Sequence, residues 1–117
     1  MDYTSISFGL EEPSLLVIMF SAEARMLVGH GNIRTRALIN GTLANPGDVY
    51  LSPYLTAESI PSHRHTLVNG AYTYNFFGQA AAGLNTIQIQ WRLTSAEDGV
   101  EGQVTDRTLT VVAFPLQ

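Results

Sequence analysis

The chain has 117 residues, a formal net charge of −4, and neither cysteine nor lysine. This length fits one compact domain, and a hydrophobic content of 45% is too high for a disordered chain. The missing residue types exclude disulfides, cysteine-ligated zinc, thiol catalysis, Schiff-base lysines and P-loop lysines. The acidic balance argues against binding to nucleic-acid phosphates, so we expect no nucleic-acid partner.

The first 12 residues differ from the rest of the chain. They are polar and mixed in character, and the segment stops at Pro13. One interpretation is an arm that docks on another molecule and whose removal leaves the fold intact. The alternative is a frayed end or a first edge strand. We divide the chain into an N-terminal arm, residues 1–12, and a folded domain, residues 13–117.

The most apolar run, Leu15–Phe20, is six residues long. A bilayer-spanning helix needs about 20 apolar residues, so this run does not predict a membrane segment. The residues before it include Asp2, Glu11 and Glu12 but no basic residue, whereas an export signal begins with positive charge. We therefore expect neither a membrane partner nor export.

The next part of the chain is typical of short strands and turns. Ser21–Val28 contains helix formers and is the best candidate for a short helix, although propensity is a weak guide. Asn32–Ile39 alternates between two sets of side chains, which predicts a strand. Asn40-Gly41 and the segment 45–48 predict turns, and Val49–Leu51 predicts a short strand.

A hairpin is predicted in the middle of the chain. Asn69-Gly70 separates Thr66–Val68 from Ala71–Tyr74, and both turn residues tolerate positive φ. Tyr54–His65 has no clear pattern and is interpreted as a crossover between sheets. The small residues of Gln79–Gly83 predict a turn.

The clearest strand is Asn85–Thr94. Alternation predicts that four of its side chains face a core: Ile87, Ile89, Trp91 and Leu93. The polar segment Ser95–Gly102 suits a hairpin loop leading to the last strand, Arg107–Phe114. Because that last strand is apolar on both faces, we expect it to be central and covered on both sides.

These elements predict an all-β fold. Seven or eight short strands lie between turn signals, at spacings near ten residues. That pattern is typical of an antiparallel β-sandwich, and we predict the jelly-roll type with about eight short strands.

A metal site is the first chemical hypothesis to weigh. On a strand, His63 and His65 would share a face, and His30, Glu58 or Asp106 could complete the ligand set. The alternative is a polar crossover segment with partly exposed histidines. We favour the alternative and predict neither a metal nor a cofactor.

Enzymatic activity is not expected. The chain has no Gly-x-Ser-x-Gly sequence, and no glycine-rich loop leads from a strand into a helix. The carboxylate pairs Glu11-Glu12 and Glu97-Asp98 are adjacent in sequence, so their side chains diverge on an extended backbone.

Polar and aromatic alternation instead predicts an interface. Long polar side chains on one face of a central strand need partners, and Tyr and Arg are enriched where proteins meet. We expect contacts between copies of the chain at Gln88, Gln90, Arg92, Arg34, Arg36, Tyr72 and Tyr74. The alternative is an ordinary solvated face.

The C-terminal third resembles a known family. The sequence GLNTIQIQWR, from Gly83 to Arg92, and DRTLTVVAF, from Asp106 to Phe114, resemble the last two strands of small jelly-roll domains in phage virion proteins. The resemblance covers residues 83–114. It implies a jelly roll similar to the trimeric tumour-necrosis-factor and C1q type.

The resemblance also implies a function. Such domains serve as capsid decoration proteins, head fibres or fibre tips, and the chain shows no shaft-like repeat. We expect a homotrimeric decoration, or cement, protein on the capsid exterior, assembled in the host cytoplasm and bound to the major capsid protein. The expected capsid contacts are Met1, Asp2, Tyr3, Glu11 and Glu12.

Two alternatives remain. One is a receptor- or carbohydrate-binding fibre tip that uses loop aromatics such as Tyr50, Tyr54 or Phe76-Phe77, although core packing also explains them. The other is a cupin-like enzyme that holds a metal with His63, His65 and Glu58.

Overall fold

The computed structural model describes residues 2–52, 55–56, 70–95, 99 and 101–116. Within these residues the chain forms strands and no helix, so the predicted all-β class is confirmed. No helix in this part of the chain could cross a membrane. The strands are β1 (Asp2–Leu10), β2 (Ser14–Val28), β3 (His30–Ile39), β4 (Thr42–Leu43), β5 (Val49–Tyr50), β6 (Leu55–Thr56), β7 (Gly70–Ala80), β8 (Gly83–Thr94) and β9 (Glu101–Pro115).

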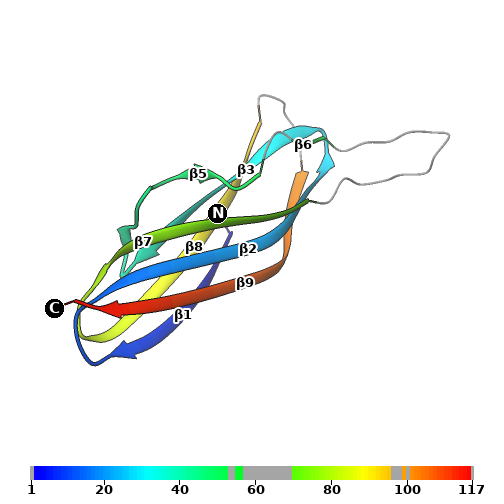
Figure 1. The fold of residues 1–117 in the computed structure, drawn as a ribbon. Coiled ribbons are helices and arrows are strands. Elements are labelled where there is room, and N and C mark those ends of the chain that lie inside the picture. The colour runs from blue at the N-terminus through cyan, green and yellow to red at the C-terminus, as the bar shows by residue number, and fades with distance from the viewer. Residues whose placement is uncertain (1, 53–54, 57–69, 96–98, 100, 117) are drawn as a thin grey trace.

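The strands form two antiparallel sheets (Figure 1). One sheet has the order β1-β8-β3-β4, and β5 and β6 also pair with β3. The other has the order β7-β2-β9. The two sheets pack face to face in a sandwich-like arrangement, so each long strand has one face toward the core and one face outward.

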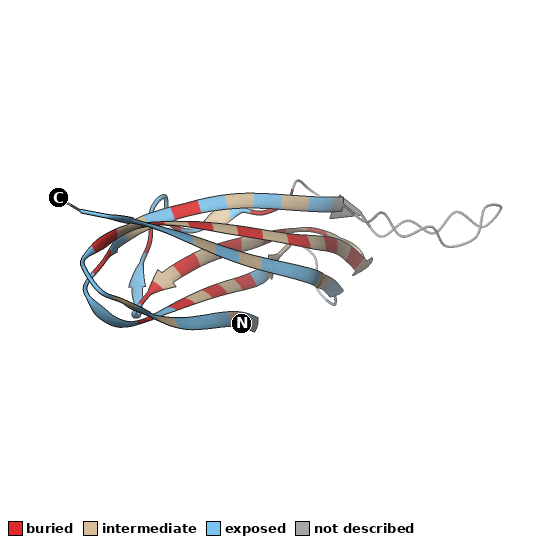
Figure 2. Cartoon of the chain, turned by 60° about the horizontal axis from the view of Figure 1, so that its bottom comes forward, coloured by how far each residue is buried: buried red, intermediate tan, exposed pale blue. Residues whose placement is uncertain are grey.

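The core follows from strict two-residue alternation. Along β2 every second residue from Ser14 to Met26 is buried, and the residues between are partly exposed (Figure 2). The same alternation buries Ile87, Ile89 and Trp91 on β8, as predicted. The rings of Phe20 on β2 and Trp91 stack with centroids 6.0 Å apart, which joins the two sheets.

Residues 2–10 are an edge strand. All nine pair with β8, from Asp2 opposite Trp91 to Leu10 opposite Gly83. The inward-facing Phe8 and Leu10 pack against the core. Of the two interpretations of the N-terminal segment, the structure has the edge strand and not a separate arm.

The expectation that the last strand is central was wrong. β9 pairs only with β2 among the described strands and lies at the edge of its sheet. Its outward side chains Val112 and Phe114 are 38% and 51% exposed. The predicted hairpin between the last two strands was also wrong, because β8 pairs with β1 and β3 whereas β9 crosses to the opposite sheet.

The central strand of the β7-β2-β9 sheet is β2. It continues as a strand through Ser21–Val28, where a short helix was the alternative, and it buries Ala22, Ala24 and Met26. Pairing on both sides outweighs the helix propensity of these residues. The predicted turn at Asn40-Gly41 is confirmed, with φ values of 51° and 84°.

Other predictions lie partly or wholly outside the described residues. These are the hairpin at Asn69-Gly70, most of the crossover Tyr54–His65, and part of the loop Ser95–Gly102.

Candidate interaction surfaces

Five of the predicted interface residues gather on the outer face of the β1-β8-β3-β4 sheet. Arg34 lies opposite Arg92, and Arg36 lies opposite Gln90, in the antiparallel register of β3 and β8. Gln88 follows on the same face of β8, next to Leu38. We call this surface the Arg/Gln face and define it by Arg34, Arg36, Gln88, Gln90 and Arg92.

Hydrogen bonds hold these side chains in place. Arg36 Nε donates to Gln90 Oε1 at 2.7 Å, and Gln90 Nε2 donates to Gln88 Oε1 at 2.6 Å. Such a chain of donors and acceptors restricts the rotamers of three long side chains, so the face is ordered before any partner arrives.

A carboxylate at the end of the face bridges two of the arginines. Asp48 accepts from Arg34 Nε at 3.3 Å and from an Arg92 terminal nitrogen at 3.1 Å. The Arg34 guanidinium also lies 4.7 Å from the Tyr50 ring centre. Sequence reasoning placed Asp48 in a turn but missed this role. The predicted turn alone did not show which side chains Asp48 would contact.

Tyr72 and Tyr74 do not join the Arg/Gln face. They lie on β7, in the other sheet, and pack against the core on its inner side. The Tyr74 and Phe76 rings are 5.2 Å apart. Alternation correctly predicted that the two tyrosines share a face, but that face is the inner one.

The predicted capsid-contact residues are spread along β1. Tyr3 is 60% exposed and lies opposite Gln90, so it extends the Arg/Gln face. Glu11 and Glu12 are exposed in the turn after β1, about 25 Å away at the usual strand rise. Asp2 lies at the opposite end of β1, and Met1 is outside the described residues. These residues therefore do not form one cluster.

The outer face of the β7-β2-β9 sheet is apolar at one end, which sequence reasoning missed. Phe77, Val17 and Val112 lie side by side across the three strands, and Leu15 is next to Phe114. We call this surface the apolar face and define it by Leu15, Val17, Met19, Phe77, Val112 and Phe114. The available signal was the run Leu15–Phe20: a strand apolar on both faces in a two-layered fold leaves one of them uncovered.

The edge strands β1 and β9 lie on the same side of the two sheets without pairing with each other (Figure 1). Their inward side chains are only partly covered, and Ile6 on β1 is 40% exposed. We call this surface the open side and define it by Ile6, Phe8, Leu10, Leu109 and Val111.

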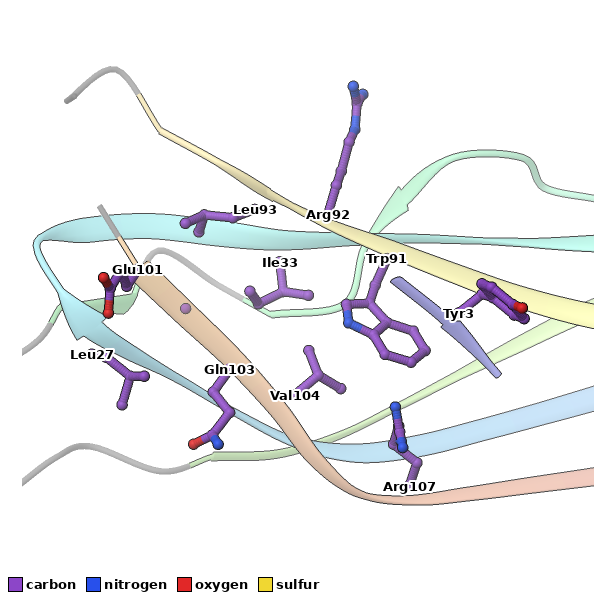
Figure 3. Close-up of a pocket in the computed structure, with 11 residues that line it drawn as sticks. Tyr3, Leu27, Ile33, Trp91, Arg92, Leu93, Glu101, Gln103, Val104 and Arg107 are labelled. Carbon is purple, nitrogen blue, oxygen red and sulfur yellow. The ribbon is translucent and has the colours of Figure 1, made fainter. Parts of the chain in front are cut away.

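The open side leads into a cavity of about 760 Å³ between β8 and the first half of β9 (Figure 3). Trp91 from β8 and Arg107 from β9 meet there, with the guanidinium 4.9 Å from the ring centre, whereas Arg92 points away. The cavity walls also include Ile33, Leu93 and Val104.

Two carboxylates meet at the irregular register between β2 and β9. The hydrogen bond and the charge repulsion from Asp106 raise the pKa of Glu23, and the nearby Arg25 opposes this. Asp106 has a positive φ of 48°. Glu23, Arg25 and Asp106 lie in the β7-β2-β9 sheet, whereas the Arg/Gln face belongs to the other sheet.

The metal hypothesis rests mostly on residues outside the described part, namely His63, His65 and Glu58. Within the described residues, no three His, Asp or Glu side chains are grouped as metal ligands would be. Of the aromatics proposed to bind sugars, Phe76 is buried, Phe77 belongs to the apolar face, and Tyr50 is 55% exposed. Tyr54 lies outside the described residues.

Comparisons of the chain with protein-family models and with curated proteins found no match. The class that the structure itself defines is an all-β, sandwich-like domain. It has one outer face rich in arginine and glutamine and one that is partly apolar.

Proposed function

We propose that this protein is a phage capsid decoration protein, a homotrimeric jelly roll that binds the outside of the shell through the major capsid protein and stabilises it. The resemblance of residues 83–114 supports the family, and these residues form β8 and most of β9. The first strand pairs with the eighth, and the second pairs with the seventh, both antiparallel. A jelly roll has this order because its chain is wound like a long hairpin that is rolled into two sheets, so the pairing supports that topology.

The observation that carries the proposal is the Arg/Gln face. Three of the six arginines of an acidic chain gather there, with Asp48 the carboxylate that bridges two of them. The face lies on a paired sheet and is ordered by its own hydrogen bonds. A surface of this kind suits a partner that presents carboxylates.

The position of Tyr3 supports one choice of partner for the Arg/Gln face. The sequence-based hypothesis gave Tyr3 to the shell and Gln90 to another copy, yet the two residues are cross-strand neighbours. Because these neighbours share one surface, we expect a single partner to cover both. We assign the whole Arg/Gln face, with Tyr3, to the shell.

The mechanism is mechanical. A trimer carries three Arg/Gln faces, so it bridges neighbouring shell subunits, and trivalency strengthens attachment without strong single contacts. Because the trimer binds the assembled shell and not its separated subunits, binding stabilises the shell by mass action. The protein folds in the host cytoplasm and acts on the capsid exterior.

The test is co-sedimentation with capsids that lack the protein. Arg36→Glu is expected to weaken binding at least tenfold, about 1.4 kcal/mol, because it places a carboxylate where the partner presents its own. Arg25→Glu is the matched control, since Arg25 also donates its Nε to a glutamine, Gln103, but on the opposite sheet. Binding that falls equally in both variants, or in neither, contradicts the assignment.

A receptor- or carbohydrate-binding tip is the second candidate. Tyr3 and Tyr50 are exposed beside the arginines, and aromatic rings next to polar side chains can stack on sugars. Binding to a glycan array that Tyr50→Ala abolishes, without any binding to capsids, would favour this candidate over the decoration role.

A further inference from the structure

The cavity between β8 and β9 contains a cation without an anionic partner. Arg107 lines it from β9, and its guanidinium lies 4.9 Å from the centre of the Trp91 ring (Figure 3). Among the residues that the structure describes, this guanidinium makes neither a hydrogen bond nor an ion pair. Because contact with an aromatic ring uses none of its N–H donors, the group can still hold an anion.

A bulge in β9 explains why Arg107 faces the cavity. Between residues 21 and 23, β2 has one residue where β9 has two, Asp106 and Arg107. Asp106 has a positive φ of 48° at this point. The extra residue shifts the alternation of side chains, so Val104 before it and Leu109 after it both pack against the core despite their odd spacing. Arg107 is two positions before Leu109 and therefore shares its inward face.

Glu101 lines the same cavity but does not neutralise Arg107. The two residues are six positions apart on β9, about 20 Å along a strand, and Figure 3 places them at opposite ends of the cavity. Physiological salt screens charges over about 8 Å, so the two interact weakly. Ile33, Leu93 and Val104 contribute aliphatic wall to the cavity. The cavity thus combines a cation at one end with apolar walls and an anion at the other end.

We propose that this cavity binds a small molecule that has an unbranched apolar chain and one terminal carboxylate, such as a medium-chain fatty acid. Its volume of about 760 Å³ is within the usual range for small-molecule sites. The carboxylate accepts charge-assisted hydrogen bonds from Arg107, and the chain lies against Trp91 and the aliphatic walls. One guanidinium balances one negative charge, which favours a carboxylate over a doubly charged phosphate. Glu101 repels the carboxylate from the other end.

The proposed ligand site goes beyond the decoration role and does not depend on it. The cavity is formed within one copy of the chain, and the residues that would hold the ligand lie outside the Arg/Gln face. A negative result here therefore leaves the decoration role to the co-sedimentation experiment with Arg36→Glu.

The single tryptophan of the chain gives a direct readout, because Trp91 is part of the cavity wall. Titration with octanoate at pH 7, below the concentration at which octanoate forms micelles, is expected to give a saturable change in tryptophan emission. 1-Octanol has the same chain without the charge and is expected to bind at least tenfold more weakly. The absence of a saturable change with octanoate, or equal affinity for the alcohol, would overturn the proposal.

Arg107→Gln tests the residue that supplies the charge. This substitution is expected to weaken octanoate binding at least tenfold and to leave 1-octanol binding unchanged. Arg25→Gln is the control, since Arg25 lies near the same bulge but donates its Nε to Gln103 and lies outside the cavity wall. Circular dichroism checks that both variants are folded. Octanoate affinity that is equal in the two variants contradicts the proposed role of Arg107.

Val104→Phe tests the cavity without removing the cation. The larger side chain occupies part of the space for the apolar chain, so it is expected to weaken the binding of octanoate and of 1-octanol alike. If both affinities stayed at the wild-type values, the ligand would lie elsewhere and the proposed site would be wrong.

Discussion

Replacing Trp91 by alanine is expected to lower the free energy of unfolding by about 3–5 kcal/mol, as for other large aromatics removed from a core. Trp91 is 6% exposed and stacks on Phe20 of the opposite sheet, so its loss leaves a cavity between the sheets. The contact with Arg107 is lost as well. Urea denaturation followed by circular dichroism measures the change.

Tyr50→Ala is the control for this substitution. Tyr50 is also aromatic and also contacts an arginine, but it is 55% exposed. Its removal is expected to cost less than about 1 kcal/mol. Equal midpoints for wild type and Trp91→Ala would show that Trp91 does not join the sheets.

Deletion of residues 1–12 is expected to destabilise the fold by several kcal/mol, on the order of 3 kcal/mol for an edge strand with two half-buried apolar anchors. The deletion removes the partner of β8 along nine residues and uncovers the core beside Phe8 and Leu10. This reverses the sequence-based expectation that the fold survives unchanged. Thermal unfolding of the shortened chain measures the loss.

A milder variant tests the charged turn after β1 separately from the strand itself. Glu11→Ala and Glu12→Ala together remove the charges of the exposed turn and leave β1 paired, so they are expected to unfold with the wild-type midpoint. If the deletion variant also kept that midpoint, β1 would contribute nothing to stability and the arm interpretation would return.

Local patterns in the sequence predicted the fold class well. The alternation of Asn32–Ile39 and Asn85–Thr94 gave both strands, and that of Asn85–Thr94 also gave its buried face, because side-chain direction in a strand depends only on the backbone. The position of a strand within a sheet depends on distant residues. Val112 and Phe114 therefore suggested a central strand, although nothing in the described part of the chain covers them.

The same difference between local side-chain direction and the position of a strand in a sheet explains where the predicted surface residues lie. Arg34, Arg36 and the polar residues of β8 lie on one surface because β3 and β8 are neighbours in register, a pairing that the sequence did not predict. Tyr72 and Tyr74 share their alternation but belong to the other sheet and face inward. The bridging role of Asp48 depends on a turn that folds back over β3, a long-range relation that composition and periodicity do not carry.

A reconstruction of the native particle by electron cryomicroscopy tests the proposed role most directly. Our account predicts threefold clusters on the outer surface of the shell, with β1, β8 and β3 against the capsid protein. Single copies, or density only at the end of a fibre, would contradict it.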